Sequence, residues 1–151
     1  MAVKLMMIDE ADLIDFQLYG LASSYSDSSH FIYHVNLKFE TQFIRSDDLD
    51  VVIEDQISYF PVFEWKNQRT GVYYNIIKNQ AYTLNSEKNS TNLSSMFAIS
   101  PYLINQHKQY NFLLKVTGDE SFKIPVFENS FIQMISSLDT SKIKKINRLI
   151  F

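Results

Sequence analysis

The strongest constraint on the fold is a pair of β-prone segments joined by a turn that contains glycine. Residues 57–66 and 72–77 are rich in aromatic and β-branched side chains, which suit half-buried strands. The intervening Asn67-Gln-Arg-Thr-Gly71 ends in a residue that tolerates a positive φ. These features predict an antiparallel hairpin. Aromatic residues make up 15% of the whole chain, which favours further strands.

The rest of the chain adds shorter elements to this hairpin. Residues 30–39 fit both strand alternation and a helical stripe, and we favour a helix because Asp27 or Ser28 supplies an N-cap. Residues 128–138 predict a second helix, since Phe131, Met134, Ile135 and Leu138 keep helical spacing. Further strands are predicted at residues 3–8, 16–22, 81–84 and 110–116, with a bend around the acidic stretch between 43 and 53. The expected fold is α+β, a mostly antiparallel sheet of about five to six strands with two helices packed on one face.

The chain has the length of a single domain, residues 1–151. Residues 85–95 contain one apolar side chain and predict a mobile polar loop. The closing Leu149-Ile150-Phe151 is apolar, which predicts that the end of the chain docks on the core.

Composition excludes several classes of protein. Without cysteine there is no disulfide scaffold, thiolate metal site or cysteine nucleophile. The apolar run at the beginning of the sequence is short and is followed by carboxylates, whereas a signal peptide has a longer apolar run followed by small residues. No apolar segment is long enough to span a membrane. We therefore expect a cytoplasmic protein with no membrane contact. Three widely spaced glycines cannot form a phosphate-binding loop.

The candidate chemistry is sparse. His30 and His34 share one helical face, but His107 lies in a different segment and zinc requires more ligands. An acidic turn that includes Asp48 and Asp50 does not match a calcium loop. Together with Arg45 this turn could serve an enzyme only if it lined a concave pocket. We expect no catalytic residues, no metal and no cofactor.

The favoured hypothesis is a non-enzymatic module that binds another protein. Rings occupy both faces of residues 59–65, so Phe60, Phe63 and Trp65 need cover from the domain, a second subunit or a partner. Residues 1–55 have a net charge of −8 (three basic residues against eleven acidic), and residues 56–151 have +5 (eleven against six). The predicted interaction residues are therefore these three rings with Arg45, Asp48 and Asp50, and a homodimer is one form that the interaction could take.

The alternative is an RNA- or ribosome-associated protein that uses the basic tail. Four cations within seven residues could contact phosphates: Lys142, Lys144, Lys145 and Arg148. Isoleucine and leucine side chains interleave with them, which is also typical of an amphipathic element docked on the core. The acidic pI, near 5.5, disfavours nucleic acid.

Short motifs across nearly the whole chain resemble a small bacterial family named for its motif IPExxxVDY. They are Phe16-x-Leu-x-Gly20, Ser-Asp before Asn36, Arg45-x-x-Asp-Leu49 and the closing Leu-Ile-Phe151. The naming motif would fall at residues 104–112, where only Ile104 is kept. Asn105, Gln106, Tyr110, Asn111 and Phe112 stand for its proline, glutamate, valine, aspartate and tyrosine. Because Gln106 and Asn111 are not ionisable, the motif is interpreted as structural. The resemblance implies kinship and a compartment, without a mechanism.

Overall fold

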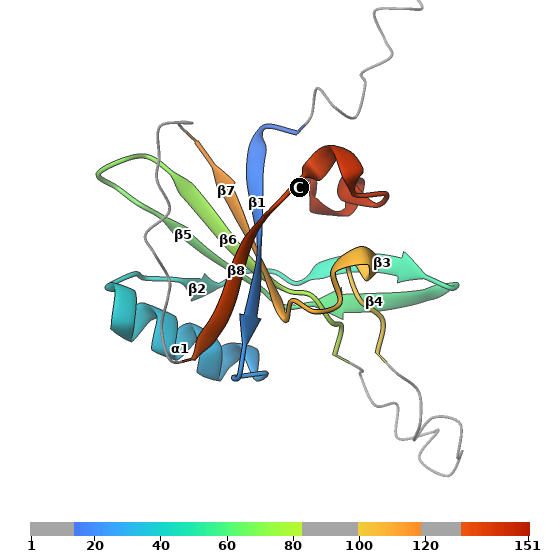
Figure 1. Ribbon diagram of the computed structural model, residues 1–151, viewed down its shortest axis with the longest axis horizontal. Helices are drawn as coiled ribbons and strands as arrows, with labels where there is room; N and C mark the ends of the chain where they lie inside the picture. Colours follow the sequence, from blue (N-terminus) through green and yellow to red (C-terminus); the bar gives the residue numbers. More distant parts are fainter. Residues whose placement is uncertain (1–13, 83–99, 119–130) are drawn as a thin grey trace, which may run out of the picture.

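The computed structural model describes residues 14–82, 100–118 and 131–151, which contain one α-helix and two antiparallel sheets (Figure 1). The larger sheet has six strands in the order β2-β5-β6-β7-β1-β8. Its strands are β1 (Phe16–Ser23), β2 (Ile44–Arg45), β5 (Val62–Lys66), β6 (Tyr73–Lys78), β7 (Phe112–Thr117) and β8 (Ile132–Leu138). The smaller sheet pairs β3 (Leu49–Ile53) with β4 (Gln56–Phe60). The helix α1 spans Ser28–Phe39, and 3-10 turns occupy Asn105–His107, Thr140–Lys142 and Ile146–Leu149.

The helix predicted from residue 30 is confirmed as α1, together with its cap. Asp27 lies just before the helix, and its side chain accepts a hydrogen bond from the backbone N–H of His30 at 3.0 Å. The helix ends where Glu40 takes a left-handed conformation with φ of 54°. Phe31, Ile32 and Val35 are buried, so the helical stripe in the sequence is the face that packs on the sheet.

The predicted hairpin is confirmed, but its first strand is interrupted. Strands β5 and β6 pair around the turn, where Gly71 has φ of 75°. Pro61 separates β4 from β5, and the two strands belong to different sheets. Proline lacks the N–H that a continuous ladder requires, so the chain leaves one sheet and enters the other at this residue.

The second predicted helix is wrong over the part that the structure describes. Residues 132–138 form β8, which pairs antiparallel with β1 from Leu18↔Leu138 to Ser23↔Ile132. The apolar spacing there suited either structure, and pairing with an adjacent strand outweighed a weak helical preference. Over the described residues the fold is therefore α+β with one α-helix in place of two. The predicted strand 3–8 and loop 85–95 lie outside the described residues, as do residues 83 and 84 of the strand predicted at 81–84.

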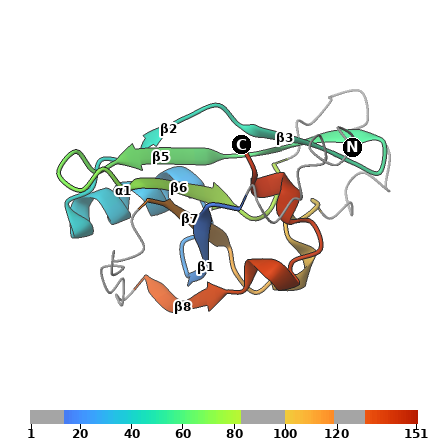
Figure 2. The same cartoon turned by 90° about the horizontal axis from the view of Figure 1, so that it is seen from above.

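The six-stranded sheet has a buried core on each face. Helix α1 covers one face, over side chains that include Phe63, Ile76, Phe112 and Leu114. The opposite face carries Leu18, Val62, Ile77 and Leu113, and the C-terminal 3-10 turns pack there through Ile143, Ile146 and Leu149. Figure 2 shows α1 and the C-terminal segment on different sides of the sheet. The predicted docking of the chain end is confirmed for Leu149, which is fully buried, whereas Phe151 is largely exposed.

Candidate interaction surface

The β3–β4 hairpin projects from the end of the molecule opposite α1 (Figures 1 and 2). Its two central turn residues, Glu54 and Asp55, both have positive φ, at 50° and 64°. Two consecutive positive φ values match the twist of a tight two-residue hairpin turn. The turn therefore holds the ladder in register up to its last pair, Ile53↔Gln56.

The two faces of this hairpin have different environments. Residues opposite each other in an antiparallel ladder share a face. The pair Leu49↔Phe60 faces the core, and Phe60 is fully buried. The pair Val52↔Ile57 lies on the opposite face, where its side chains are 67% and 58% exposed. A strand pair thus presents apolar side chains to solvent.

Two tyrosines extend this apolar face toward the body of the protein. Tyr59, on β4, lies on the same face as Ile57 and forms a β-bridge with Tyr82. Their rings stack with centroids 6.2 Å apart and planes 28° from parallel. Tyr82 is 40% exposed. We call the set Val52, Ile57, Tyr59 and Tyr82 the hairpin surface.

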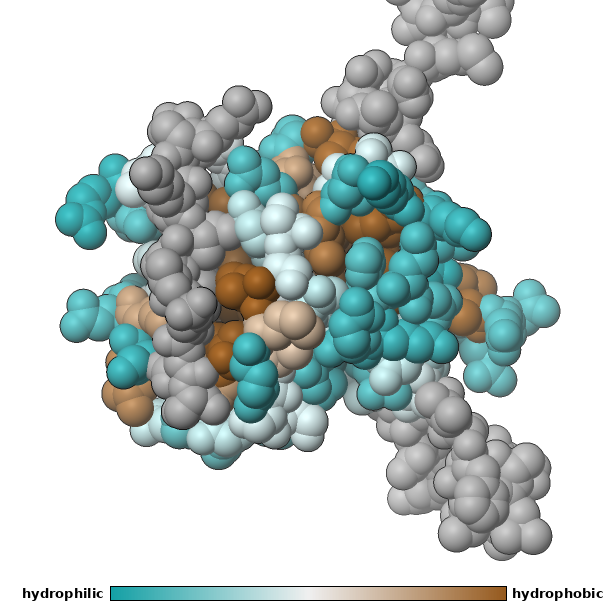
Figure 3. All heavy atoms as spheres, in the orientation of Figure 1, coloured by the Kyte–Doolittle hydropathy of each residue, from teal (hydrophilic) through white to brown (hydrophobic). Residues whose placement is uncertain are grey.

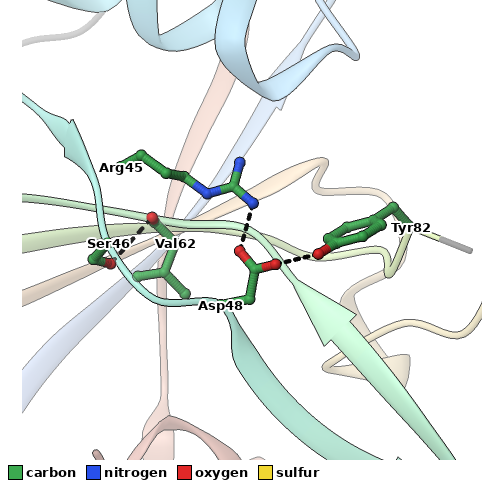
Figure 4. Close-up of polar contacts among 5 residues, drawn as sticks. All are labelled: Arg45, Ser46, Asp48, Val62 and Tyr82. Atoms are coloured by element: carbon green, nitrogen blue, oxygen red, sulfur yellow. Dashed lines mark hydrogen bonds and ion pairs between the residues drawn. The ribbon is translucent and has the colours of Figure 1, made fainter. Parts of the chain in front are cut away.

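A polar cluster fixes the position of Tyr82 (Figure 4). Its hydroxyl donates to Oδ2 of Asp48, and Arg45 donates to Oδ1 of the same carboxylate at 2.5 Å. The hydrogen bond to Asp48 raises the pKa of Tyr82 above its usual value. Ser46 secures the loop further, because its N–H and its hydroxyl both donate to the carbonyl of Val62, at 3.0 and 3.1 Å. The ring is therefore held in place at the surface.

Carboxylates surround the hairpin surface. Asp50 lies on its exposed face opposite Tyr59, and Glu54 and Asp55 form the turn. Asp47 and Asp48 precede β3. Figure 3 shows apolar atoms bordered by hydrophilic ones where β3 and β4 project. The result is an apolar patch with an acidic rim.

The predicted aromatic site is corrected by this geometry. Phe60 and Phe63 are 0% and 5% exposed and belong to the two cores, so neither can contact a partner. Trp65 is partly buried and stacks on Tyr74 with centroids 5.1 Å apart. Of the predicted residues, Arg45, Asp48 and Asp50 border the hairpin surface. The sequence signal that could have located it is the alternation within β4, where Ile57 and Tyr59 share the face opposite Phe60.

The predicted nucleic-acid residues do not form one free group. Lys142, Lys144 and Lys145 are exposed. Arg148 instead donates to the carbonyl of Leu103 at 2.7 Å and is partly buried. Lys142 lies 4.0 Å from Asp139. The tail is thus a docked element that leaves three lysines facing solvent.

Two residues of the divergent 104–112 segment have structural contacts. Gln106 donates to the carbonyl of Lys142 at 3.0 Å and accepts from the N–H of Lys144 at 2.8 Å, so it holds the tail. Asn111 accepts from the N–H of Ser23 at 2.8 Å. A carboxylate in place of Gln106 could not donate to the carbonyl. These contacts agree with the structural interpretation of the segment.

The described residues contain neither a group of metal-ligating side chains nor a helix suited to span a membrane. His30 and His34 lie side by side, with ring centroids 4.6 Å apart, and His107 lies beyond the helix in a separate 3-10 turn. Within the described ranges no three His, Asp or Glu side chains gather as a metal-ligand set. Among these same residues there is no helix with both the length and the apolar character needed to cross a membrane.

No family model matches the chain, and no curated protein or solved structure matches it. The resemblance to the IPExxxVDY family therefore stays a prediction.

Proposed function

We propose that this chain is a non-enzymatic, cytoplasmic protein-interaction module that docks a partner protein on the hairpin surface. The observation that carries the proposal is the exposed Val52↔Ile57 pair on a projecting hairpin, next to the stacked Tyr59 and Tyr82. Apolar side chains gathered on a protruding element and rimmed by polar groups are typical of interfaces.

The rim also indicates the chemistry of the partner. Asp50 lies on the face of the patch, Glu54 and Asp55 form the adjacent turn, and Asp48 accepts a hydrogen bond from Tyr82. Arg45 offsets one of them through its 2.5 Å contact with Asp48. A basic surface with apolar side chains at its centre complements this arrangement, and opposite charges speed encounter. The partner is therefore expected to be a basic protein, and binding is expected to weaken as salt increases.

The test compares two pairs of lysine substitutions in the full chain. The first pair, Val52→Lys and Ile57→Lys, places charges on the hairpin surface. The matched control is Tyr33→Lys and Leu37→Lys on the exposed face of α1, where the parent side chains are 63% and 67% exposed. Proteins captured from native cells by the tagged wild type are purified, and their affinity for all three chains is measured by calorimetry. Circular dichroism checks that both variants fold.

The expected result is a one-to-one partner whose affinity falls at least about a hundredfold with the hairpin variant and is unchanged with the α1 variant. Sedimentation of the isolated chain decides whether that partner is a second copy. A partner that binds the hairpin variant as well as the wild type would refute this surface. Failure to find a partner that binds the purified wild type would also refute it.

The second candidate function is RNA binding by the tail, favoured by the exposure of Lys142, Lys144 and Lys145. Three phosphate contacts on single-stranded RNA predict that log K falls with log salt with a slope of about −2. Exchanging the three lysines for glutamine should abolish binding to a labelled single-stranded RNA. RNA affinity that is independent of salt, or that survives this exchange, would refute it.

A further inference from the structure

A row of polar side chains crosses the otherwise apolar sheet on the face away from α1. Three adjacent strands place Glu64, Asn75 and Lys115 in register, through the pairs Glu64↔Asn75 and Asn75↔Lys115. Asn75 is 2% exposed and Lys115 is 5% exposed. Burial of such groups is unfavourable unless they are paired, so this row requires a physical reason.

The ammonium of Lys115 contacts two aromatic rings and one main-chain oxygen, but no side-chain carboxylate among the described residues. Its Nζ lies 4.0 Å from the ring centroid of Phe151 and 4.7 Å from that of Phe16. It also donates a long hydrogen bond, at 3.5 Å, to the main-chain oxygen of Phe151. Across residues 14–82, 100–118 and 131–151, no Asp or Glu side chain comes within 4.0 Å of it. Burial lowers the pKa of Lys115, and the more distant Asp15 partly opposes this shift.

The row lines a pocket of about 700 Å³. One side is the sheet itself, and the loop before β3, Asp15 and Phe151 form the others. Tyr73 donates to Glu64 and so holds the carboxylate of Glu64 in place. Asp15, Asp47 and Glu64 line the pocket as well, and none has an ion pair among the described residues. The pocket therefore holds a buried cation at one place and unpaired carboxylates at others.

We propose that this pocket binds a short amino acid zwitterion, with the ligand carboxylate at Lys115 and Asn75 and its ammonium at Glu64. A ligand with only a negative charge would be repelled by the three carboxylates, and a ligand with only a positive charge would be repelled by Lys115. A zwitterion satisfies both. This proposal does not depend on partner binding at the hairpin surface, because none of the four residues of that surface lines the pocket.

The spacing of the strands limits the length of the ligand. Adjacent strands lie about 4.8 Å apart, so Glu64 and Lys115, two strands apart, are separated by about 10 Å. Side chains stand roughly perpendicular to a sheet, so the strand spacing sets the scale of the distance between the two charged groups. Subtracting two hydrogen bonds of about 2.8 Å leaves about 4–5 Å between the charged groups of the ligand. That is close to the span of 4-aminobutyrate.

The experiment measures binding of 4-aminobutyrate to the full chain by calorimetry, with butyrate and butylamine as probes that each carry one of its charges. We expect a Kd of about 1 mM or tighter for 4-aminobutyrate, and at least about tenfold weaker binding of the other two. Lys115→Met and Glu64→Gln should each weaken it about tenfold or more, because each removes a charged hydrogen-bonding group. Lys78→Met is the matched control, since burial also lowers the pKa of Lys78 but its side chain lies in a different pocket.

Each outcome decides the proposal. It is supported if only the zwitterion binds well, both pocket variants lose binding, and Lys78→Met and the hairpin variant keep it. Equal binding of butylamine would show a simple cation site and overturn it. Undetectable binding of 4-aminobutyrate at about 10 mM, ten times the expected Kd, would overturn it too. Circular dichroism confirms that the variants are folded, and Glu64→Gln preserves the shape of the side chain.

Discussion

The β3–β4 hairpin and the C-terminal tail both combine apolar and charged residues, yet their apolar side chains have different environments. In the tail, Ile143, Ile146 and Leu149 are buried against the sheet, and the lysines between them face solvent. In the hairpin, Val52 and Ile57 face solvent together on one side. The same kind of pattern therefore contributes to stability in one segment and is available for recognition in the other.

The largest expected difference between the two regions is in stability. Leu149→Ala removes a fully buried side chain from the tail and should lower the free energy of unfolding by about 3 kcal/mol, through lost burial and the cavity left behind. Chemical denaturation measures this change. A loss below about 1 kcal/mol would show that the tail contributes little to the core.

The contact that holds the tail is the next to test. Gln106→Ala removes two hydrogen bonds to the tail backbone, at the carbonyl of Lys142 and the N–H of Lys144, and should cost about 1–2 kcal/mol. Hydrogen exchange should show faster opening of residues 142–149 in this variant. Unchanged exchange there would mean that the buried side chains hold the tail without Gln106.

The hairpin should tolerate substitution. Val52→Thr with Ile57→Thr keeps β-branched side chains and removes exposed apolar surface, so the free energy of unfolding should change by less than about 1 kcal/mol. Denaturation of this double variant beside Leu149→Ala compares the two regions directly. A loss as large as that of Leu149→Ala would mean that the hairpin surface is structural.

The smallest expected effect is on the stability of the tail at low pH. Asp139 begins the tail, and hydrogen bonds from the hydroxyl and the N–H of Ser141 hold the pKa of its carboxyl below 3.8. A depressed pKa contributes stability above the unfolded value, and this contribution disappears as pH falls through the folded one. Protection of the tail should therefore decrease below pH 3.8 in the wild type and less so in Asp139→Asn. NMR titration of both chains tests this, and a midpoint at or above 3.8 would contradict it.

Local signals predicted the elements whose determinants are close together in the chain. The β5–β6 hairpin follows from its strand residues and Gly71, and α1 follows from Asp27 and its apolar stripe. The local spacing of residues 132–138 favoured a helix, but their pairing with β1 joins segments more than a hundred residues apart. Long-range pairing outweighed local spacing there.

The candidate site was predicted only in part. Arg45, Asp48 and Asp50 stood out as a charged turn, and they border the hairpin surface. Phe60 and Phe63 were chosen for their size, but ring size does not say which face of a strand is covered. The interruption at Pro61 places these two rings in different cores, which only the complete fold shows.

By itself the sequence determined an antiparallel α+β class, the capped helix and the hairpin turn, because each depends on neighbouring residues. Only the tertiary structure decided which apolar side chains remain exposed and which polar ones are buried. Glu64, Asn75 and Lys115 are as much as 51 residues apart in the chain and become neighbours through strand pairing. Exposure and the gathering of charges depend on what packs beside each strand, and residues far along the chain supply that packing.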